Sequence, residues 1–372
     1  MQDASERLHY MDHLRALAML AGVAFHAMLA YSPLMHPIFP TADRQMSPAV
    51  DGVAWALHLV RMPLFFLVAG FFAAWVIARR GGAALARQRV RRILLPFLVA
   101  WPLVWLSLSA GVVWAAENVQ HPSPLLAMVR QWLAMPDAPD APLGTAHLWF
   151  LYYLLLFALL HWVARTLEAG RWLDALLLRS PLWILLGLPL LLVPALASVT
   201  APHPAPESVL PQFWALVYYG AFFALGTGVH ARADWLQTLR PFVPWLALAC
   251  GVAYVAFLWG MKQRDAAAAY ASASWPLAAL EACLGVWGTL LCLWAGQRLL
   301  DRPSAVMRYL AQSAYWTYLL HLPLLFAIQY LLMDRDWAWP LKFVVGLGAT
   351  LGLCLLTYQV FVRHTPLRRF VG

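Results

Sequence analysis

Long apolar stretches constrain this chain more than any other feature of its sequence. A transmembrane helix needs about 20 mostly apolar residues. Stretches of that kind lie at residues 14–32, 53–78, 93–115, 147–165, 182–199, 211–230, 242–260, 274–297, 309–333 and 340–362. Of the 372 residues, 63% are hydrophobic and only 12% are charged, a balance that a water-soluble fold of this length could not bury. The sequence therefore predicts an all-α polytopic membrane protein with about ten transmembrane helices.

The connections between these stretches are short, so we expect a single transmembrane domain over residues 1–372. The longest connection, residues 116–146, is rich in proline and acidic near its end. No internal repeat is evident, which disfavours an inverted-repeat transporter. The polar start of the chain also lacks a basic segment leading to a small-residue cleavage site, so we expect no cleaved signal peptide.

The distribution of basic residues predicts the orientation of the chain in the membrane. Alternate connections and the two ends of the chain together carry 18 arginines, among them Arg7, Arg171 and Arg369. The opposite connections hold only Arg44, Arg130, Lys262, Arg264 and Arg335. Because basic residues favour the cytoplasmic side, both termini are predicted to be cytoplasmic, in a bacterial inner membrane. Topology then accounts for the net charge of +9, and we expect no nucleic-acid partner.

The cysteines do not predict a disulfide or a metal site. All four lie inside apolar stretches, without CxxC spacing and without a nearby histidine pair: Cys250, Cys283, Cys292 and Cys354. Side chains in such positions usually serve packing.

Ionisable residues inside apolar stretches are the best functional pointers, because each costs about 2.5–3.5 kcal/mol to place in the hydrocarbon layer. In the first stretch, Arg15 and His26 are eleven residues apart, which is close to three helical turns and about 16 Å. Asp12, Met19 and Gly22 share their face. Imidazole exchanges a proton readily near neutral pH. A histidine bonded to a neighbouring helix is the alternative, but the alignment with Asp12 and Arg15 favours function.

Two further arginine positions stand out. Arg89 and Arg92 face the same way where the third stretch begins, and two guanidiniums there suit a phosphate-bearing ligand. Simple anchoring at the cytoplasmic surface explains them equally well. In the second stretch, His58 and Arg61 share a face, and Arg61 needs an anionic partner or a water-filled cavity. Gly70, farther along that stretch, would allow a close approach of two backbones.

Single polar residues complete the set of candidates. His147 precedes Trp149 at the outer start of the fourth stretch, whereas Glu281 and His321 lie deeper in the eighth and ninth stretches. Each of them alone is more often a satisfied core group than a functional one. We keep them as possible site residues.

Several of these motifs together resemble the membrane acyltransferase 3 family. MDHLRALAMLAGVAFH, with Arg15 and His26, is similar to the family's first-helix signature, and Arg89, Arg92 and Pro96 resemble its arginine motif. RMPLFFLVAGFF, HLWFL and YLLHLPL follow in the family's order. The resemblance covers essentially the whole chain. HLVRMPLFF and the lack of a fused periplasmic domain resemble a branch that adds succinyl groups to osmoregulated periplasmic glucans. Ala69 and Leu322 depart from that branch, which often has a serine and a second histidine there.

The resemblance implies a reaction and a set of roles. Acyl-CoA, expected to be succinyl-CoA, would be the donor on the cytoplasmic side, with its phosphate on Arg89 and Arg92, and a periplasmic glucan hydroxyl would be the acceptor. His26 would act as a base or relay the acyl group covalently. Asp12 and Arg15 would order the cavity mouth. Arg61 would hold the oxyanion or the free carboxylate of a succinyl group. No metal or other cofactor is expected.

Three alternatives remain open at this stage. One is an O-acetyltransferase that acts on lipopolysaccharide O-antigen or on exopolysaccharide. Another is a transporter or flippase whose path is lined by Arg15, His26 and Arg61. The third is a haem- or metal-binding membrane protein, although the histidines show no axial pairing and no HExxH spacing.

Overall fold

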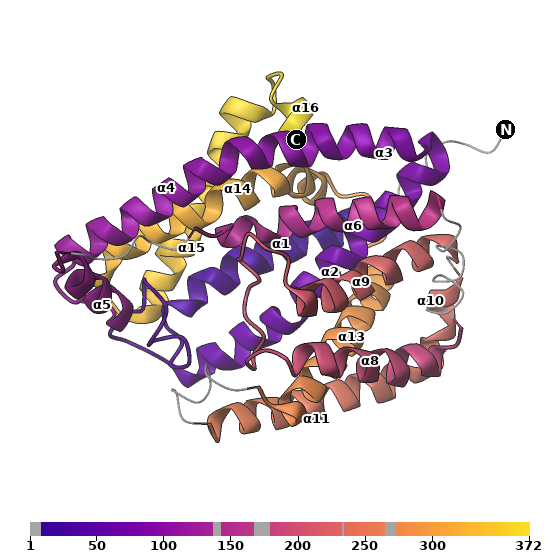
Figure 1. The fold of residues 1–372 in the computed structure, drawn as a ribbon, viewed down its shortest axis with the longest axis horizontal. Helices are drawn as coiled ribbons and strands as arrows, with labels where there is room; N and C mark the ends of the chain where they lie inside the picture. The colour runs from indigo at the N-terminus through magenta and orange to yellow at the C-terminus, as the bar shows by residue number, and fades with distance from the viewer. Residues whose placement is uncertain (1–8, 137–142, 167–178, 233, 265–272) are drawn as a thin grey trace.

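The computed structural model describes residues 9–136, 143–166, 179–232, 234–264 and 273–372, and Figure 1 shows a bundle of helices. Apart from two isolated β-bridges, the regular elements of the described residues are helical, which confirms the all-α prediction. The α-helices are α1 His9–Leu29, α2 Pro48–Arg80, α3 Gly82–Arg89, α4 Leu95–Asn118, α5 Pro124–Leu133, α6 Trp149–Thr166, α8 Leu188–Leu196, α9 Phe213–Ala231, α10 Trp235–Thr238, α11 Val243–Lys262, α13 Trp275–Leu299, α14 Ala305–Met333, α15 Trp339–Thr357 and α16 Arg368–Val371.

Short segments of tighter or wider helix extend several of these elements. Two are 3₁₀ segments, η2 Ala146–Leu148 and η4 Arg240–Phe242. Three are π-helical segments, η1 Val90–Leu94, η3 Trp183–Gly187 and η5 Tyr358–Val362. Segment η1 joins α3 to α4 without a break, so the two helices continue one another.

The predicted spans correspond to helices throughout, although not all of them are equally apolar. Seven helices of the described residues are long and apolar enough to cross a membrane: Pro48–Arg80, Gly82–Asn118, Ala146–Thr166, Trp235–Lys262, Trp275–Leu299, Ala305–Met333 and Trp339–Val362. The other three predicted spans fall on α1, on α9 and on the shorter helix Trp183–Leu196. Helix α1 carries Asp12, Arg15 and His26, which lower its hydropathy. The chain is therefore a multi-pass membrane protein.

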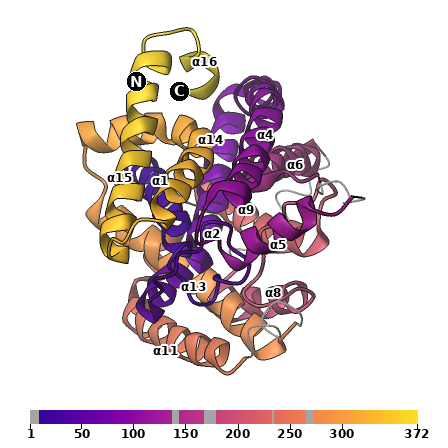
Figure 2. The ribbon, with the colours of Figure 1, turned by 90° about the vertical axis from the view of Figure 1, so that its left-hand side faces the viewer.

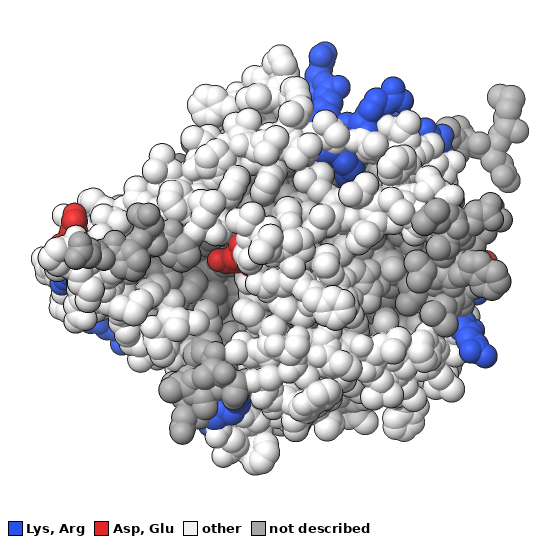
Figure 3. Space-filling model, in the orientation of Figure 1, with Lys and Arg blue, Asp and Glu red and all other residues white. Residues whose placement is uncertain are grey.

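The helices divide into a centre and a periphery. In Figures 1 and 2, α2 lies inside the bundle, and α4, α11 and α15 lie on its outside. The outer helices expose large apolar side chains; Trp245, Leu248, Val252, Val255 and Trp259 do so along α11. Figure 3 shows that the broad middle of one face carries almost no charge, and that basic side chains gather near its edges. Such a surface suits contact with lipid.

Helices α2 and α9 pack closely because two glycines lie at their contact. A Cβ atom at Gly70 would stand 2.0 Å from the backbone oxygen of Phe223, and one at Gly226 would stand 1.9 Å from that of Leu67. No larger residue fits either position without moving a backbone. The close approach predicted at Gly70 is thereby confirmed.

The structure leaves the predicted orientation untested, because it holds no membrane. Arg7 and Arg171, two of the arginines that carry the prediction, lie outside the described residues.

Candidate functional site

Two cavities lie end to end inside the bundle. The first, which we call the arginine cavity, has a volume of about 900 Å³. Its polar lining consists of Arg15, Gln88, Arg89, Arg92, Gln312, Tyr315, Tyr318, Arg363, His364, Thr365, Arg368 and Arg369. The second, the histidine cavity, has a volume of about 530 Å³ and is lined by His26, His58, Arg61, His147, Thr200, His203, Glu207, Tyr219, Tyr318 and His321 among apolar residues. Four residues line both cavities: Met19, Phe65, Phe150 and Tyr318.

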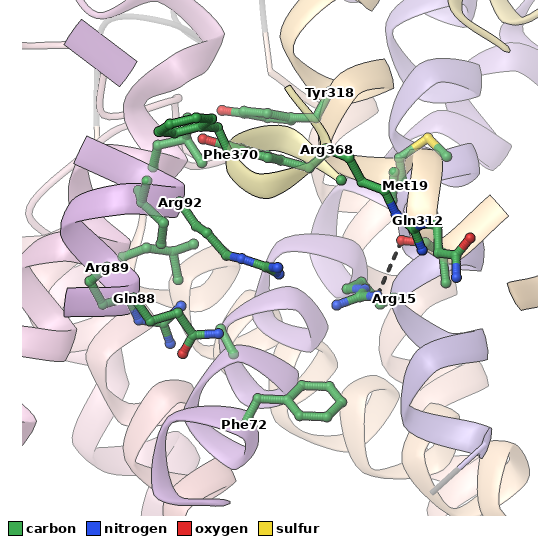
Figure 4. A pocket seen from close by; sticks show the side chains of 18 of the residues that line it. Arg15, Met19, Phe72, Gln88, Arg89, Arg92, Gln312, Tyr318, Arg368 and Phe370 are labelled. Atoms are coloured by element: carbon green, nitrogen blue, oxygen red, sulfur yellow. Dashed lines mark hydrogen bonds between the residues drawn. The ribbon is translucent and has the colours of Figure 1, made fainter. Parts of the chain in front are cut away.

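The π-helical segment η1 places the arginine pair. Arg89 is the last residue of α3 and Arg92 lies within η1, and both line the arginine cavity, as their spacing predicts. Arg91 turns elsewhere and stacks on the ring of Phe370, 5.1 Å from its centre. Wide helical turns of this kind are frequent at functional sites. In Figure 4, the guanidiniums of Arg92 and Arg15 point toward one another across the cavity.

Positive charge dominates the arginine cavity. No Asp or Glu side chain is found among its described lining residues. Within the part of the chain that the structure describes, no carboxylate pairs with Arg89, Arg92, Arg368 or Arg369, and the Nε atom of Arg89 is buried without a hydrogen-bond partner. Forked guanidiniums without counter-charges form a receptor for phosphate groups. The geometry therefore suits a polyanionic ligand.

Asp12 and Arg15 occupy different places although they share a helix. Arg15 lines the arginine cavity, and its Nη2 donates to the backbone oxygen of Ala311 at 3.1 Å and pairs with the Asp12 carboxylate at 3.2 Å. Asp12 itself lines neither large cavity; it borders a small one of about 110 Å³ with His9, His13 and Arg308. Its contact with either ligand site runs through Arg15.

The histidine cavity brings together candidates that are far apart in the sequence. His26 comes from α1, His58 and Arg61 from α2, His147 from η2 and His321 from α14. The ring of His26 lies 5.4 Å from that of His321, and the ring of His321 lies 5.0 Å from that of His147. These are distances between ring centres. Three imidazoles thus form a continuous row along one wall.

Hydrogen bonds fix two of these three rings and leave one free. His147 Nε2 and His321 Nδ1 both bond to the backbone oxygen of Tyr318, at 3.0 and 2.8 Å. The Tyr318 hydroxyl in turn donates to the backbone oxygen of His147. The ring of His26 makes no hydrogen bond to any described residue; its contacts are the rings of Phe25 and His321. An unbonded imidazole in a cavity is available to a substrate.

Arg61 brings a positive charge to the same cavity. Its guanidinium lies over the ring of Phe25, 4.0 Å from the centre, and Nη1 donates to the backbone oxygen of Gly22 at 3.4 Å. The described residues give it no carboxylate partner. The sequence requires either an anion or a cavity at this arginine, and the structure shows the cavity.

Glu281 lies behind the histidine cavity and does not line it. Its carboxylate oxygen Oε2 accepts from the backbone N–H of His203 at 3.1 Å and from the ring Nδ1–H at 2.6 Å. The other oxygen, Oε1, is buried without a partner. Glu281 is therefore only partly satisfied.

Among the lining residues that sequence reasoning missed are His203, Arg363, Arg368 and Arg369. His203 lies between two apolar stretches, in APHPAPE, and the unpaired Glu281 within the eighth stretch was the only sign that it needed a partner. Arg363, Arg368 and Arg369 were counted only for orientation, and nothing in their spacing showed that the end of the chain returns to the cavity. Within the described residues, no three His, Cys, Asp or Glu side chains are grouped so that they could hold a metal ion.

Comparison with known proteins finds a protein family whose model matches most of this chain. A family model described as an acyltransferase domain matches residues 8–359. "Glucans biosynthesis protein C" of Salmonella schwarzengrund is 23% identical over 376 residues, which cover 98% of this chain and 94% of the relative. The protein of that name from Salmonella paratyphi B is 24% identical over 377 residues with the same coverage. No solved structure matches.

Proposed function

The chain belongs to the acyltransferase 3 family and is an acyltransferase, and we propose that it transfers a succinyl group from succinyl-CoA to hydroxyls of a periplasmic glucan. The observation that carries this proposal is the meeting of two chemically different cavities at Met19 and Tyr318. One is cationic and suits a phosphorylated donor, whereas the other is lined by imidazoles. The relatives named for glucan biosynthesis support the choice of acceptor.

The donor would enter at the end of the bundle that carries α3 and α16. We take this end to be cytoplasmic, because arginines are concentrated there. The phosphates of CoA would rest on Arg89 and Arg92, with Arg368 and Arg369 lining the same cavity. The flexible pantetheine arm would pass Met19 and place the thioester carbonyl beside His26.

His26 can act on the carbonyl in two ways. As a general base, it would take the proton of the acceptor hydroxyl; as a nucleophile, it would carry the acyl group between donor and acceptor. Arg61, at the same depth of the cavity, would stabilise the negative charge that develops on the carbonyl oxygen, or would bind the free carboxylate of a succinyl group. Both roles need an arginine without a competing carboxylate.

Purified protein in proteoliposomes tests the proposal. We expect mass spectrometry to find succinyl esters on osmoregulated glucan after incubation with succinyl-CoA, and much less product with acetyl-CoA. His26→Ala should abolish the product, whereas His161→Ala, which changes a histidine outside both cavities, should not. If the wild type leaves the glucan unmodified but acetylates O-antigen or exopolysaccharide, the donor and acceptor proposed here are wrong.

Two lining residues are compatible with the alternative function, that of an O-acetyltransferase. Ala69 lines the arginine cavity and Leu322 lines the histidine cavity, and both depart from the residues usual in the glucan branch. An apolar Leu322 in the same cavity as His26 would suit a short, uncharged acyl group better than a carboxylate. The comparison of the two donors therefore decides between the readings.

A further inference from the structure

A non-helical segment forms one wall of the histidine cavity. It links α8 to α9, and Thr200, Pro202, His203, Pro204, Ala205 and Glu207 line the cavity from it. A bond from the Thr145 N–H to the backbone oxygen of Glu207, at 2.7 Å, holds this segment against the residues before η2. Irregular backbone at membrane depth is tolerated where it borders such a cavity.

Three bonds hold His203 in one position on this segment. Its backbone N–H and ring Nδ1–H both donate to Glu281 Oε2, and His58 Nε2–H donates to its backbone oxygen at 3.0 Å. The side chains of His203 and Glu281 are each 1% exposed. A carboxylate that accepts from Nδ1–H selects the tautomer in which Nε2 carries the lone pair. Nε2 is buried and has no partner among the described residues.

Stabilisation of the fold is a poor explanation for the buried pair of His203 and Glu281. A buried polar atom without a partner costs about 1–3 kcal/mol, and here both His203 Nε2 and Glu281 Oε1 are unpaired. Two apolar residues of similar volume would pack at this position without that cost. Unsatisfied groups of this kind call for another explanation, and an oriented imidazole with a free lone pair has an evident chemical use.

The position of His203 suits a role toward the acceptor in the proposed reaction. Its ring lies 4.6 Å from that of His58, and His58 is seven residues from Phe65, where the two cavities meet. Seven residues of helix span about 10 Å. His203 is thus near the part of the histidine cavity that is remote from the arginine cavity.

We propose that His203, oriented by Glu281, is in place of His26 the general base that accepts the proton of the acceptor hydroxyl. This inference rests on the proposed function. The O–H bond breaks as the proton moves to Nε2, the oxygen attacks the thioester carbonyl, a C–O bond forms and the C–S bond breaks. The thiolate of CoA then receives the proton, so His203 ends neutral. If His26 first carries the acyl group, the C–S bond breaks in that earlier step as the C–N bond forms; the attack of the hydroxyl then breaks the C–N bond, and His203 returns the proton to His26. Glu281 is a positioning residue.

A comparison of two acceptors, glucan and hydroxylamine, distinguishes a general base from a residue that only supports the structure. Hydroxylamine is a nucleophile that attacks acyl groups without prior loss of a proton, so it needs no base. We expect His203→Gln to lower the rate of transfer from succinyl-CoA to glucan by about 100-fold or more, and to leave transfer to hydroxylamine, above the rate without enzyme, nearly unchanged. Glu281→Gln should show the same split to a smaller degree.

Two control variants show whether a loss of transfer is specific to His203 and Glu281. His161→Gln removes a histidine outside both cavities, and Thr289→Val alters a buried polar residue on the same helix as Glu281; both should behave as wild type. Should His203→Gln fail to fold, Glu281→Gln carries the same comparison. Equal losses with glucan and hydroxylamine, or no loss with either, would overturn the role of His203. A wild type that acylates hydroxylamine but not glucan would instead overturn the proposed acceptor, and this inference with it.

Discussion

Arg15 and His26 lie eleven residues apart on α1 and line two different cavities, with Met19 between them lining both. One helix therefore runs from the cationic compartment into the imidazole compartment. Gly22, on the same face, lines only the second cavity. In the proposed reaction, the arginines hold the donor at one end of this face, and His26 acts on its carbonyl at the other end.

Enlarging Met19 should separate donor binding from transfer. Met19→Trp fills the junction between the cavities, so the thioester cannot reach His26, while the arginines still hold the phosphates. We expect unchanged thermal stabilisation by succinyl-CoA and little acylated glucan. Met19→Leu, which keeps the volume, is the control and should stay active. Full activity of the tryptophan variant would mean that the donor does not pass Met19.

Removing Arg89 and Arg92 should weaken donor binding. Hydrogen bonds to charged groups contribute about 1.5–3 kcal/mol each, so the double alanine variant should bind succinyl-CoA at least ~100-fold more weakly. Calorimetry in detergent measures this, and the difference should shrink at high salt. Arg79→Ala with Arg80→Ala removes as much charge from the end of α2, outside the cavity. If the two double variants bind succinyl-CoA equally well, Arg89 and Arg92 serve only to anchor the protein at the membrane surface.

Gly70→Ala should destabilise the fold. The new Cβ would meet the Phe223 carbonyl, and forcing two backbones apart should cost about 1–3 kcal/mol. Gly52→Ala in the same helix places its Cβ in open space and should leave the melting temperature unchanged or slightly raised. Size-exclusion profiles and melting temperatures in detergent provide the comparison. Two variants of equal stability would contradict the close packing of α2 against α9.

A buried ion pair gives a further stability prediction. Lys342 of α15 is fully buried, and its Nζ lies 2.6 Å from Asp43 Oδ2 and donates to the backbone oxygen of Met333 at 3.3 Å. Lys342→Met leaves the Asp43 carboxylate buried and unpaired, which costs about 3–5 kcal/mol. Adding Asp43→Asn should restore much of the melting temperature lost. If the double variant melts no higher than the single one, the pair is not what Lys342 contributes.

The local sequence predicted the helices and the residues whose roles depend on helical spacing. Apolar length located the spans, and a spacing of three residues was enough to place Arg89 and Arg92 on one cavity. The requirement of close packing was visible at Gly70 because a glycine within an apolar stretch favours helix contact. The intramembrane candidates His26, His58, Arg61, His147 and His321 were found because charge and imidazole are costly in lipid.

Contacts between distant segments could not be predicted in the same way. His203 lies in a connection between apolar stretches, where a histidine costs nothing, and only the folding of that segment against α13 brings it to Glu281. Arg368 and Arg369 looked like ordinary cytoplasmic residues because their return to the arginine cavity depends on η5 and α16. In both cases, the information lies in packing between elements rather than in any local pattern.

Tyr318 connects the junction of the two cavities with the turn that carries His147. Tyr318 lines both cavities, and its hydroxyl donates to the backbone oxygen of His147 in the 3₁₀ turn η2. Rotating this ring would release that turn at the same moment. Any change in the position of the Tyr318 ring at the junction of the cavities would therefore also change how the turn that carries His147 is held.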